Sequence, residues 1–336
     1  MTCSVIVSVV DPSGVAAARR AATAMAAGAL DESALGRLAL VTTEAASNLL
    51  KHAGGGDIVL RSLDHGSGVE VLAIDRGRGM ADVTACLRDG YSTAGSPGTG
   101  LGAIGRVADS VDIYSDPGRG TILLAQVTTN DAGSTPAIEV GAVCVPHPAE
   151  VDCGDAWSAA ELSGITRILI VDGLGHGPVA QAAARLAVET FDQWAREGPG
   201  AIVEALHDAL RSTRGAALAI AELDGRAGVV RFCGVGNIRA AILDVGSERR
   251  LVSHNGTAGH QVHRIQEFVY PWPDAAVVVL HTDGVTTHWD LAKHPGLLSM
   301  RHPAIIAGLL YRDFRRMRDD ATVVVARRAS RGRDRQ

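Results

Sequence analysis

Four short acidic elements in the second half of the 336-residue chain have the residue types of a site for divalent metal ions. They are, in order, Cys153-Gly154-Asp155-Ala156-Trp157, Asp172-Gly173-Leu174-Gly175-His176-Gly177, His281-Thr282-Asp283-Gly284 and Asp319-Asp320-Ala321-Thr322. Asp172 and Asp283 each end an apolar run typical of a strand, and Asp320 begins one, so we expect these carboxylates to converge at strand ends. Carboxylate oxygens in this number suit Mg²⁺ or Mn²⁺. Two such ions held close together activate a water and clamp a phosphoryl group for in-line attack.

Each of these elements has an ordinary structural interpretation when it is taken alone. An Asp-Gly pair is most often a β-turn, and the pair Asp319-Asp320 is typical of a helix cap or a solvated surface. The number and the order of the four elements favour the metal site. His176 follows Asp172 closely and has two interpretations, since it either donates a proton to a leaving group or belongs to the turn.

The first half of the chain contains four further elements that together indicate a nucleotide pocket. They are Glu44 to Ala53, Asp75-Arg76-Gly77-Arg78-Gly79-Met80, Gly95-Ser96-Pro97-Gly98-Thr99-Gly100-Leu101-Gly102 and Gly118-Arg119-Gly120-Thr121. Glu44 and Asn48 are four residues apart, so on a helix they project from one face. A carboxylate and an amide on that face can hold a hydrated Mg²⁺ and orient a nucleophile.

The glycine-bearing elements fit the base and the phosphates of a nucleotide. Asp75 ends an apolar strand, where it can accept a hydrogen bond from an adenine amino group, and Gly77 and Gly79 let the backbone approach a flat base. The run through Gly98, Gly100 and Gly102 leads into a helix, and a helix start suits phosphates. Alone, each motif is typical of a turn or a flexible loop, so the prediction depends on the ordered set.

Both sets of residues need helices and strands to position them. In the first half the pattern predicts helices over 12–27 and 33–50, and strands over 57–63, 69–75 and 121–127. In the second half it predicts helices over 178–196, 201–213 and near 303–317, and strands over 165–172, 216–223, 229–234, 240–243, 275–282 and 322–326. This mixture indicates α/β layers in both halves. The polar run 128–136 follows an apolar strand, so we expect a domain boundary there.

The N-terminal elements resemble the GHKL (Bergerat) ATPase fold of histidine kinases, gyrase B and Hsp90, and more closely the RsbT-like anti-sigma-factor kinases. The resemblance covers about residues 5–127 and is most specific at 89–93, the glycine-rich run, Arg106 and 118–121. It implies that Glu44 is the general base, that Asn48 ligates Mg²⁺ and that Asp75 binds adenine. It further implies that the other nucleotide-binding residues of an ATP site are Gly77, Gly79, Gly98, Gly100, Gly102 and Thr121.

The C-terminal elements resemble the PPM-type Ser/Thr phosphatases, in particular the SpoIIE/RsbX-like branch, over about residues 139–327. The resemblance implies an α/β/β/α sandwich that binds two Mn²⁺ or Mg²⁺ ions. The metal ligands that it implies are Asp155, Asp172, Asp283, Asp320 and the carbonyl of Gly173. One position departs from the family, because Ser158 stands where many relatives have a second acidic residue in the first motif. The expected domains are therefore 1–130 and 139–328, with a linker over 131–138.

Composition and charge exclude several other classes of protein. The net charge is −5 and the sequence pI is about 6.2, which do not indicate nucleic acid or an anionic membrane as a partner. The start of the chain lacks the pattern of a signal peptide and no apolar run is long enough to span a membrane, so we expect a cytoplasmic protein. The five cysteines include no CxxC pair, so their spacing indicates neither a zinc site nor a disulfide framework.

Together the two resemblances predict a bifunctional signalling switch. It would be a Ser/Thr kinase and a metal-dependent Ser/Thr phosphatase acting on a STAS-domain protein, either an anti-sigma antagonist or a stressosome scaffold. An alternative is a phosphatase whose N-terminal domain only senses ATP or grips a sigma factor or STAS protein. A third hypothesis is an anti-sigma factor that sequesters its sigma factor directly. Both Glu44 and Asn48 are present, and this favours catalysis, since binding alone does not need the base.

Overall fold

The computed structural model describes the chain except for residues 1–2, 64–65, 87–99, 130–135, 290 and 330–336. The chain divides into two compact units. We call Ser4–Ser134 the N-terminal unit, and Thr135–Gln336 together with Met1–Cys3 the C-terminal unit. Within the described ranges, no helix is both long enough and apolar enough to cross a membrane.

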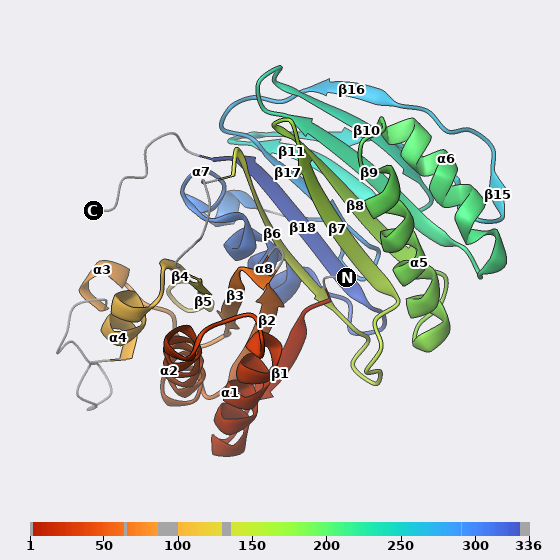
Figure 1. Cartoon of the computed structure of the whole chain (residues 1–336). Helices are drawn as coiled ribbons and strands as arrows, with labels where there is room; N and C mark the ends of the chain where they lie inside the picture. The colour runs from red at the N-terminus through yellow and green to blue at the C-terminus, as the bar shows by residue number, and fades with distance from the viewer. Residues whose placement is uncertain (1–2, 64–65, 87–99, 130–135, 290, 330–336) are drawn as a thin grey trace. The chain divides into compact units, whose positions relative to one another are not determined.

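The N-terminal unit is an antiparallel five-stranded sheet with the strand order β1-β2-β3-β5-β4. The strands are β1 Val5–Val9, β2 Gly56–Ser62, β3 Gly68–Ile74, β4 Ser110–Asp116 and β5 Gly120–Thr128. The helices are α1 Pro12–Ala26, α2 Glu32–Asn48, α3 Val83–Cys86 and α4 Gly100–Val107, and α2 continues as a π-helix over Leu49–Ala53. The buried core forms where Ala18, Leu38 and other helix residues pack against β2, β3 and β5. This unit is therefore an α/β sandwich (Figure 1).

The ends of the long helices follow from local chemistry. Asp11 caps α1 by accepting hydrogen bonds from the backbone of Ser13 and Gly14, and Asp31 caps α2 through Ala34. The π-helix after α2 ends at Gly54, whose φ of 73° favours glycine. The predicted helices and strands of this half lie within about three residues of the observed ones, whereas β1 and β4 were not predicted.

The C-terminal unit contains two larger sheets. One has the order β13-β10-β9-β8-β7 with β16 paired to β10, and the other has the order β12-β11-β17-β18-β6. Their strands are β6 Ile138–Val145, β7 Asp155–Leu162, β8 Ile165–Gly173, β9 Ala216–Asp224, β10 Val229–Val235, β11 Arg239–Asp244, β12 Ser247–Leu251, β13 Ser253–His254, β16 Phe268–Pro271, β17 Val277–His281 and β18 Ala321–Arg328, and a small hairpin joins β14 Gly256–Thr257 to β15 Gln261–Val262. The main helices are α5 Pro178–Trp194, α6 Pro199–Ala209, α7 Leu297–Met300 and α8 Pro303–Phe314.

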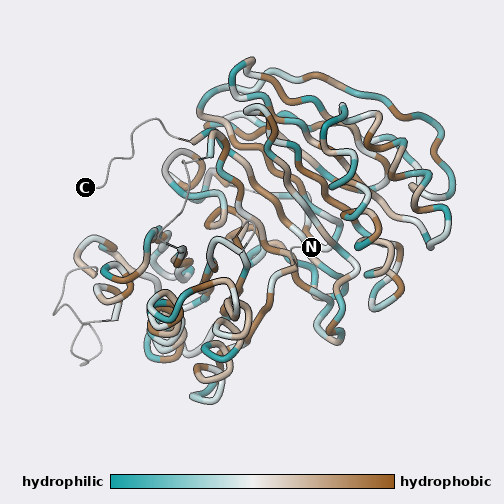
Figure 2. Tube along the Cα trace, in the orientation of Figure 1, coloured by the Kyte–Doolittle hydropathy of each residue, from teal (hydrophilic) through white to brown (hydrophobic). Residues whose placement is uncertain are grey.

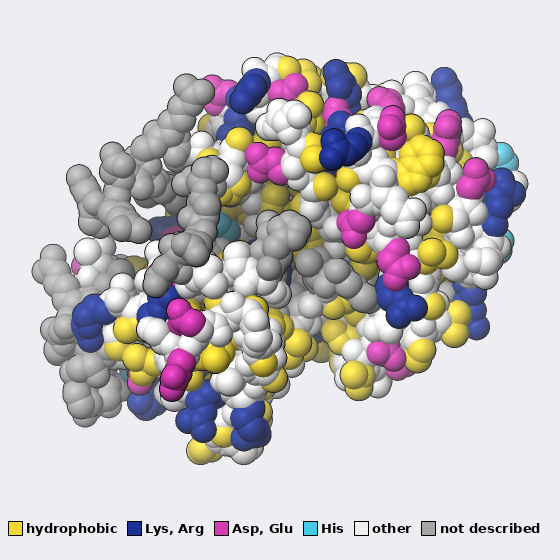
Figure 3. All heavy atoms as spheres, in the orientation of Figure 1, with side chains coloured by type: hydrophobic (Ala, Val, Ile, Leu, Met, Phe, Trp, Pro, Cys, Tyr) yellow, Lys and Arg dark blue, Asp and Glu magenta, His cyan; other side chains and the backbone are white. Residues whose placement is uncertain are grey.

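Two apolar cores make this unit a sandwich of four layers. Trp157, Ile168, Phe232 and Leu280 belong to a core that both sheets line, and a second core joins α5 and α6 to the outer face of β7, β8 and β9. Helix α8 packs against β6 and β18 on the other side. Figure 2 shows the apolar residues running along the strands while the connecting loops are polar. The expected α/β/β/α arrangement is confirmed. On the face drawn in Figure 3, acidic and basic side chains are interspersed.

The hairpin of β7 and β8 positions much of the acidic site. Its turn consists of Ser163 and Gly164, whose φ angles are 56° and 80°, so both central residues are left-handed. The turn pairs Leu162 with Ile165 and fixes the register along both strands. β6 and β7 were not predicted from the sequence. β7 is rich in alanine and lacks a clear alternation of apolar and polar residues.

Candidate functional sites

Strand register brings the first two acidic elements together. Asp155 begins β7 and lies directly opposite Asp172, which lies at the end of β8. The N–H of Gly173 donates to the Gly154 carbonyl oxygen over 3.0 Å and continues this pairing. Opposite residues in an antiparallel pair have neighbouring side chains, so the two carboxylates share one end of the sheet. Asp155 is deeply buried, with 1% of its surface exposed.

The other two carboxylates come from neighbouring strands of the second sheet. Asp283 follows β17 and Asp320 precedes β18, and these strands pair antiparallel. Asp320 accepts hydrogen bonds from the backbone N–H of His147 (2.7 Å) and of Gly154 (2.9 Å). The hydroxyl of Thr282 donates to Oδ2 of Asp155 over 2.7 Å. These contacts join the two sheets at the acidic end, so all four predicted carboxylates lie in one region.

Two glycines of the motifs are required by close packing. A Cβ at Gly154 would lie 2.8 Å from Oδ2 of Asp320 and 2.7 Å from Cβ of Ala180. A Cβ at Gly284 would overlap the carbonyl oxygen of Asp320. Glycine at these two positions therefore lets the chain segments that carry the carboxylates approach one another.

The electrostatics of the cluster fit a cation. Burial, followed by repulsion from Asp283 and Asp319, raises the pKa of Asp172 to about 8. Burial and the charge of Asp172 raise the pKa of Asp155, and burial is also the main cause of the raised pKa values of Asp283 and Asp320. Carboxylates held this close repel one another, and a divalent cation would remove that repulsion. The donor set thus fits Mg²⁺ or Mn²⁺, with the Gly173 carbonyl adjacent to Asp172 as a further oxygen.

Several residues around the cluster were not predicted as site residues. The amide of Asn237 donates to Oδ2 of Asp283 over 2.8 Å, and Asp319 lies close enough to raise the pKa of both Asp172 and Asp283. Their signals in the sequence were the run Gly234–Asn237 and the doubled Asp319-Asp320. Arg214 lies beside the turn after β8, because a Cβ at Gly175 would be 3.7 Å from its Nη1.

His176 and Ser158 both have defined positions. Nδ1 of the exposed His176 lies 2.9 Å from Oε1 of Glu150, and its ring stacks on His147 with centroids 5.5 Å apart. His176 is therefore an ordered residue at the rim of the cluster. Ser158 lies on β7, and its hydroxyl is 3.4 Å from Oδ1 of Asp192 in α5. Ser158, the residue that departs from the family motif, therefore contacts helix α5.

In the N-terminal unit, Glu44 and Asn48 lie on the face of α2 that contacts the start of α4. A Cβ at Gly100, the first residue of α4, would lie 3.0 Å from Oε2 of Glu44 and 3.2 Å from Oδ1 of Asn48. The Nδ2 of Asn48 is buried and has no hydrogen-bond partner within the described residues. An amide of this kind calls for a ligand or water. Gly102 is buried two residues further along α4, and Gly98 lies outside the described residues.

The other predicted nucleotide-binding residues form a compact turn. Oδ1 of Asp75 accepts hydrogen bonds from the N–H of Gly77 (2.7 Å) and of Thr121 (3.1 Å). Gly79 has a φ of 68°, and a Cβ there would overlap the carbonyl oxygen of Asp116. The hydroxyls of Thr121 and Ser115 are 2.9 Å apart. This turn, the paired Glu44 and Asn48, and the start of the eight-residue helix α4 provide the polar groups that an adenine nucleotide with Mg²⁺ requires.

Fold and site define two classes of domain on one chain, a GHKL ATPase sandwich followed by a PPM-type metallophosphatase sandwich. The family model of the histidine kinase-like ATPase domain matches residues 9–126, and that of stage II sporulation protein E (SpoIIE) matches residues 163–329. The chain therefore belongs to the RsbT-like kinases of the histidine kinase-like ATPase family through its N-terminal domain, and to the SpoIIE phosphatases through its C-terminal domain.

Individual relatives agree with this assignment. The chain is 32% identical over 109 residues to the serine/threonine-protein kinase RsbT of Bacillus subtilis (strain 168), covering 32% of this chain and 80% of RsbT. It is 22% identical over 143 residues to the phosphoserine phosphatase RsbX of the same organism, covering 42% of this chain and 71% of RsbX.

Two solved structures share the fold. A chain described with the bacterial stressosome, a modular system adapted to control secondary messenger signalling, has a TM-score of 0.53 and 28% identity, covering 56% of this chain and 99% of that one. RsbX in complex with magnesium has a TM-score of 0.52 and 18% identity, covering 59% of this chain and 98% of RsbX, which shows the fold alone.

Proposed function

We propose that this chain is a bifunctional signalling switch, a metal-dependent Ser/Thr phosphatase joined to an ATP-dependent Ser/Thr kinase. The observation that carries the proposal is the convergence of Asp155, Asp172, Asp283 and Asp320 at one end of paired strands. The kinase part rests on Glu44 and Asn48 beside the start of α4.

In the phosphatase site, the four carboxylates and the Gly173 carbonyl would hold two divalent ions. When bound, such ions supply an activated water and neutralise charge on the phosphoryl group. The chain's own residues keep the ligands in place, since Thr282 orients Asp155, the N–H groups of His147 and Gly154 orient Asp320, and Asn237 orients Asp283. Arg214 beside Gly175 is the cation that would attract the phosphoryl group of the substrate.

In the kinase site, Asp75 would accept a hydrogen bond from adenine, and the start of α4 would bind the phosphates. Asn48 would ligate Mg²⁺. Glu44 would take the proton from the attacking serine or threonine hydroxyl, since it is the carboxylate nearest to the start of α4 among the predicted residues. The acceptor hydroxyl would belong to a separate protein.

The relatives support the kind of substrate. One is named a serine/threonine-protein kinase and the other a phosphoserine phosphatase, and one structural neighbour is described with the bacterial stressosome. We propose that both sites act on a serine or threonine of a STAS-domain protein, either an anti-sigma antagonist or a stressosome scaffold.

The test uses two variants of the full chain, each with one active site. Asp172→Asn protein with ATP and Mg²⁺ should phosphorylate a purified STAS-domain protein, and Glu44→Ala protein with Mn²⁺ should remove that phosphate, both followed by mass spectrometry. Glu32→Ala, an exposed change at the start of the same helix, is the control and should keep both activities. ATP binding without transfer by the Asp172→Asn protein would reduce the N-terminal domain to a binding module.

A further inference from the structure

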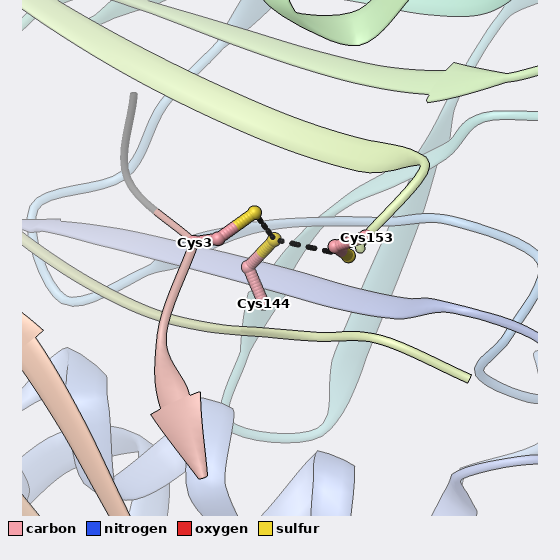
Figure 4. A group of neighbouring side chains, drawn as sticks. All are labelled: Cys3, Cys144 and Cys153. Atoms are coloured by element: carbon pink, nitrogen blue, oxygen red, sulfur yellow. Dashed lines mark hydrogen bonds between the residues drawn. The ribbon is translucent and has the colours of Figure 1, made fainter. Parts of the chain in front are cut away.

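Three cysteines that are far apart in the sequence meet in the C-terminal unit (Figure 4). Cys144 lies on β6, Cys153 lies just before β7, and Cys3 belongs to this unit although it precedes the N-terminal unit in the sequence. The Sγ atom of Cys144 is 3.5 Å from that of Cys3 and 3.9 Å from that of Cys153. All three sulfur atoms lie within 4.8 Å of one another. The spacing of the cysteines gave no sign of this cluster.

The two sulfur–sulfur distances of 3.5 and 3.9 Å are close to those between thiolates bound to a single ion. A zinc–sulfur bond is about 2.3 Å long, so three sulfurs on one ion lie roughly 3.7–4.0 Å apart in tetrahedral or trigonal geometry. A disulfide would need a separation of about 2.05 Å. Buried cysteines often pack simply as small apolar side chains. Packing alone does not require three sulfur atoms to gather within 4.8 Å of one another.

The ligand type and the apolar surroundings of the cysteines favour a thiophilic metal ion. Cys144 and Cys153 are 0% and 2% exposed and belong to the apolar core between the two sheets. Thiolates prefer Zn²⁺ or Cu(I), whereas Mg²⁺ and Mn²⁺ prefer oxygen. Cys3 is only partly buried, unlike Cys144 and Cys153.

Asp155 contacts the cysteine cluster through its backbone carbonyl and the acidic site through its side chain. The Sγ atoms of Cys3 and Cys144 lie 3.5 and 3.7 Å from the backbone carbonyl oxygen of Asp155. The carboxylate of Asp155 instead accepts the hydroxyl of Thr282 in the acidic site. One residue thus has soft sulfur donors at its backbone and hard oxygen donors around its side chain.

We propose that Cys3, Cys144 and Cys153 bind one thiophilic metal ion, such as Zn²⁺ or Cu(I), in a site separate from the acidic metal site. Thiolate ligands release protons when they bind a metal, so binding is favoured as pH rises. The ion would also hold Cys3 against β6 and the start of β7.

Cadmium titration of the reduced full chain tests this proposal. In a large excess of Mg²⁺, which occupies oxygen sites, we expect one equivalent of Cd²⁺ to produce a thiolate-to-metal charge-transfer absorption. Zn²⁺ should compete with it. Cys3→Ser should weaken Cd²⁺ binding at least about tenfold, since one of three ligands is lost. Because Cys3 lies near the chain start and is partly exposed, this variant tests the site without opening the core.

Two matched controls come from the remaining cysteines. Cys86 lies in the N-terminal unit and Cys233 is buried on β10, so Cys86→Ser and Cys233→Ala should leave the titration unchanged. Absence of the absorption, or its persistence in Cys3→Ser, would overturn the proposal. The proposal would also be overturned if the reduced protein binds no Cd²⁺ and instead forms a Cys3–Cys144 disulfide in air, seen as a mass loss of two hydrogens. The cluster would then be a redox pair.

Discussion

The acidic site and the nucleotide site are held in different ways. At the acidic site, Asp155, Asp283 and Asp320 each accept a hydrogen bond from a neighbouring hydroxyl, amide or backbone group, and strand pairing sets their positions. At the nucleotide site, the residues come from a helix face, a turn and a helix start. There the buried Nδ2 of Asn48 lacks a partner within the described residues.

The acidic site is thus organised by hydrogen bonds within the fold, whereas the nucleotide site has a buried polar group without a protein partner among the described residues. The acidic-site carboxylates repel one another whether or not a substrate is present, and bound cations would offset that repulsion. Under the proposed function, ATP would satisfy Asn48 and the start of α4 at the nucleotide site. The following substitutions test whether the two sites respond in these two ways.

The largest effect is expected at Asp172. Asp172→Asn keeps the shape of the side chain but removes a charge that the cations need, and carboxylate sites lose affinity when ligand charge is cut. Mn²⁺-dependent hydrolysis of p-nitrophenyl phosphate and of a phosphorylated STAS-domain protein should be abolished, and Asp283→Asn should have the same effect. Asp208→Asn, an exposed change on α6, serves as the control. Hydrolysis that survives in Asp172→Asn at ordinary metal concentrations would disprove the two-metal assignment.

The next largest effect is expected at Glu44. Glu44→Ala should lower phosphate transfer to the protein substrate by about 10²–10⁴-fold, the usual range for loss of a general base. The affinity for ATP should stay near that of the unaltered chain, because the proposed base would act on the acceptor hydroxyl and not on ATP. Transfer rates and calorimetric binding would be measured on the same preparation. Unchanged transfer would show that Glu44 is not the base.

A smaller effect is expected at Asp75. Asp75→Asn retains an oxygen that can accept from the N–H groups of Gly77 and Thr121, so the turn should persist. Binding of ATP should weaken by about 1.5–3 kcal/mol because a charged hydrogen bond is lost. Asp11→Asn is a matched control, since asparagine caps a helix as well as aspartate does. Full ATP affinity in a folded Asp75→Asn protein would remove Asp75 from the base pocket.

The smallest effect concerns each site's response to the other. Every nucleotide-site residue named above lies in the N-terminal unit, and every phosphatase ligand lies in the C-terminal unit. Asp172→Asn should therefore change ATP affinity by less than about 0.5 kcal/mol, as expected for independent sites. Calorimetry on this variant checks the expectation. Joint loss of hydrolysis and ATP binding would contradict the partition into two independent sites.

The sequence predicted best those residues whose neighbours along the chain reveal their position. Asp172, Asp283 and Asp320 border apolar strands, so their convergence followed from the strand pattern. Asp155 was among the four acidic elements found in the sequence, but β7 has no clear pattern, so its place at a strand end was not predicted. Glu44 and Asn48 share a helix face because helical spacing is local.

Other features depend on contacts that spacing along the chain cannot show. Cys3 and Cys144 are 141 residues apart, so no local motif could bring them together. The contact of Asn237 with Asp283 spans 46 residues and depends on the pairing of β11 with β17. The π-helix after α2 was also missed, because helical periodicity does not distinguish it from an α-helix over one turn.

The turn of Ser163 and Gly164 determines which residues pair at the opposite end of the hairpin of β7 and β8. Asp155 lies seven residues before Leu162, so at about 3.3 Å per residue the turn sets a carboxylate pair roughly 23 Å away. One residue inserted in either strand would send one carboxylate to the opposite face of the sheet. The pairing of Asp155 with Asp172 thus depends on the number of residues between each of them and the turn.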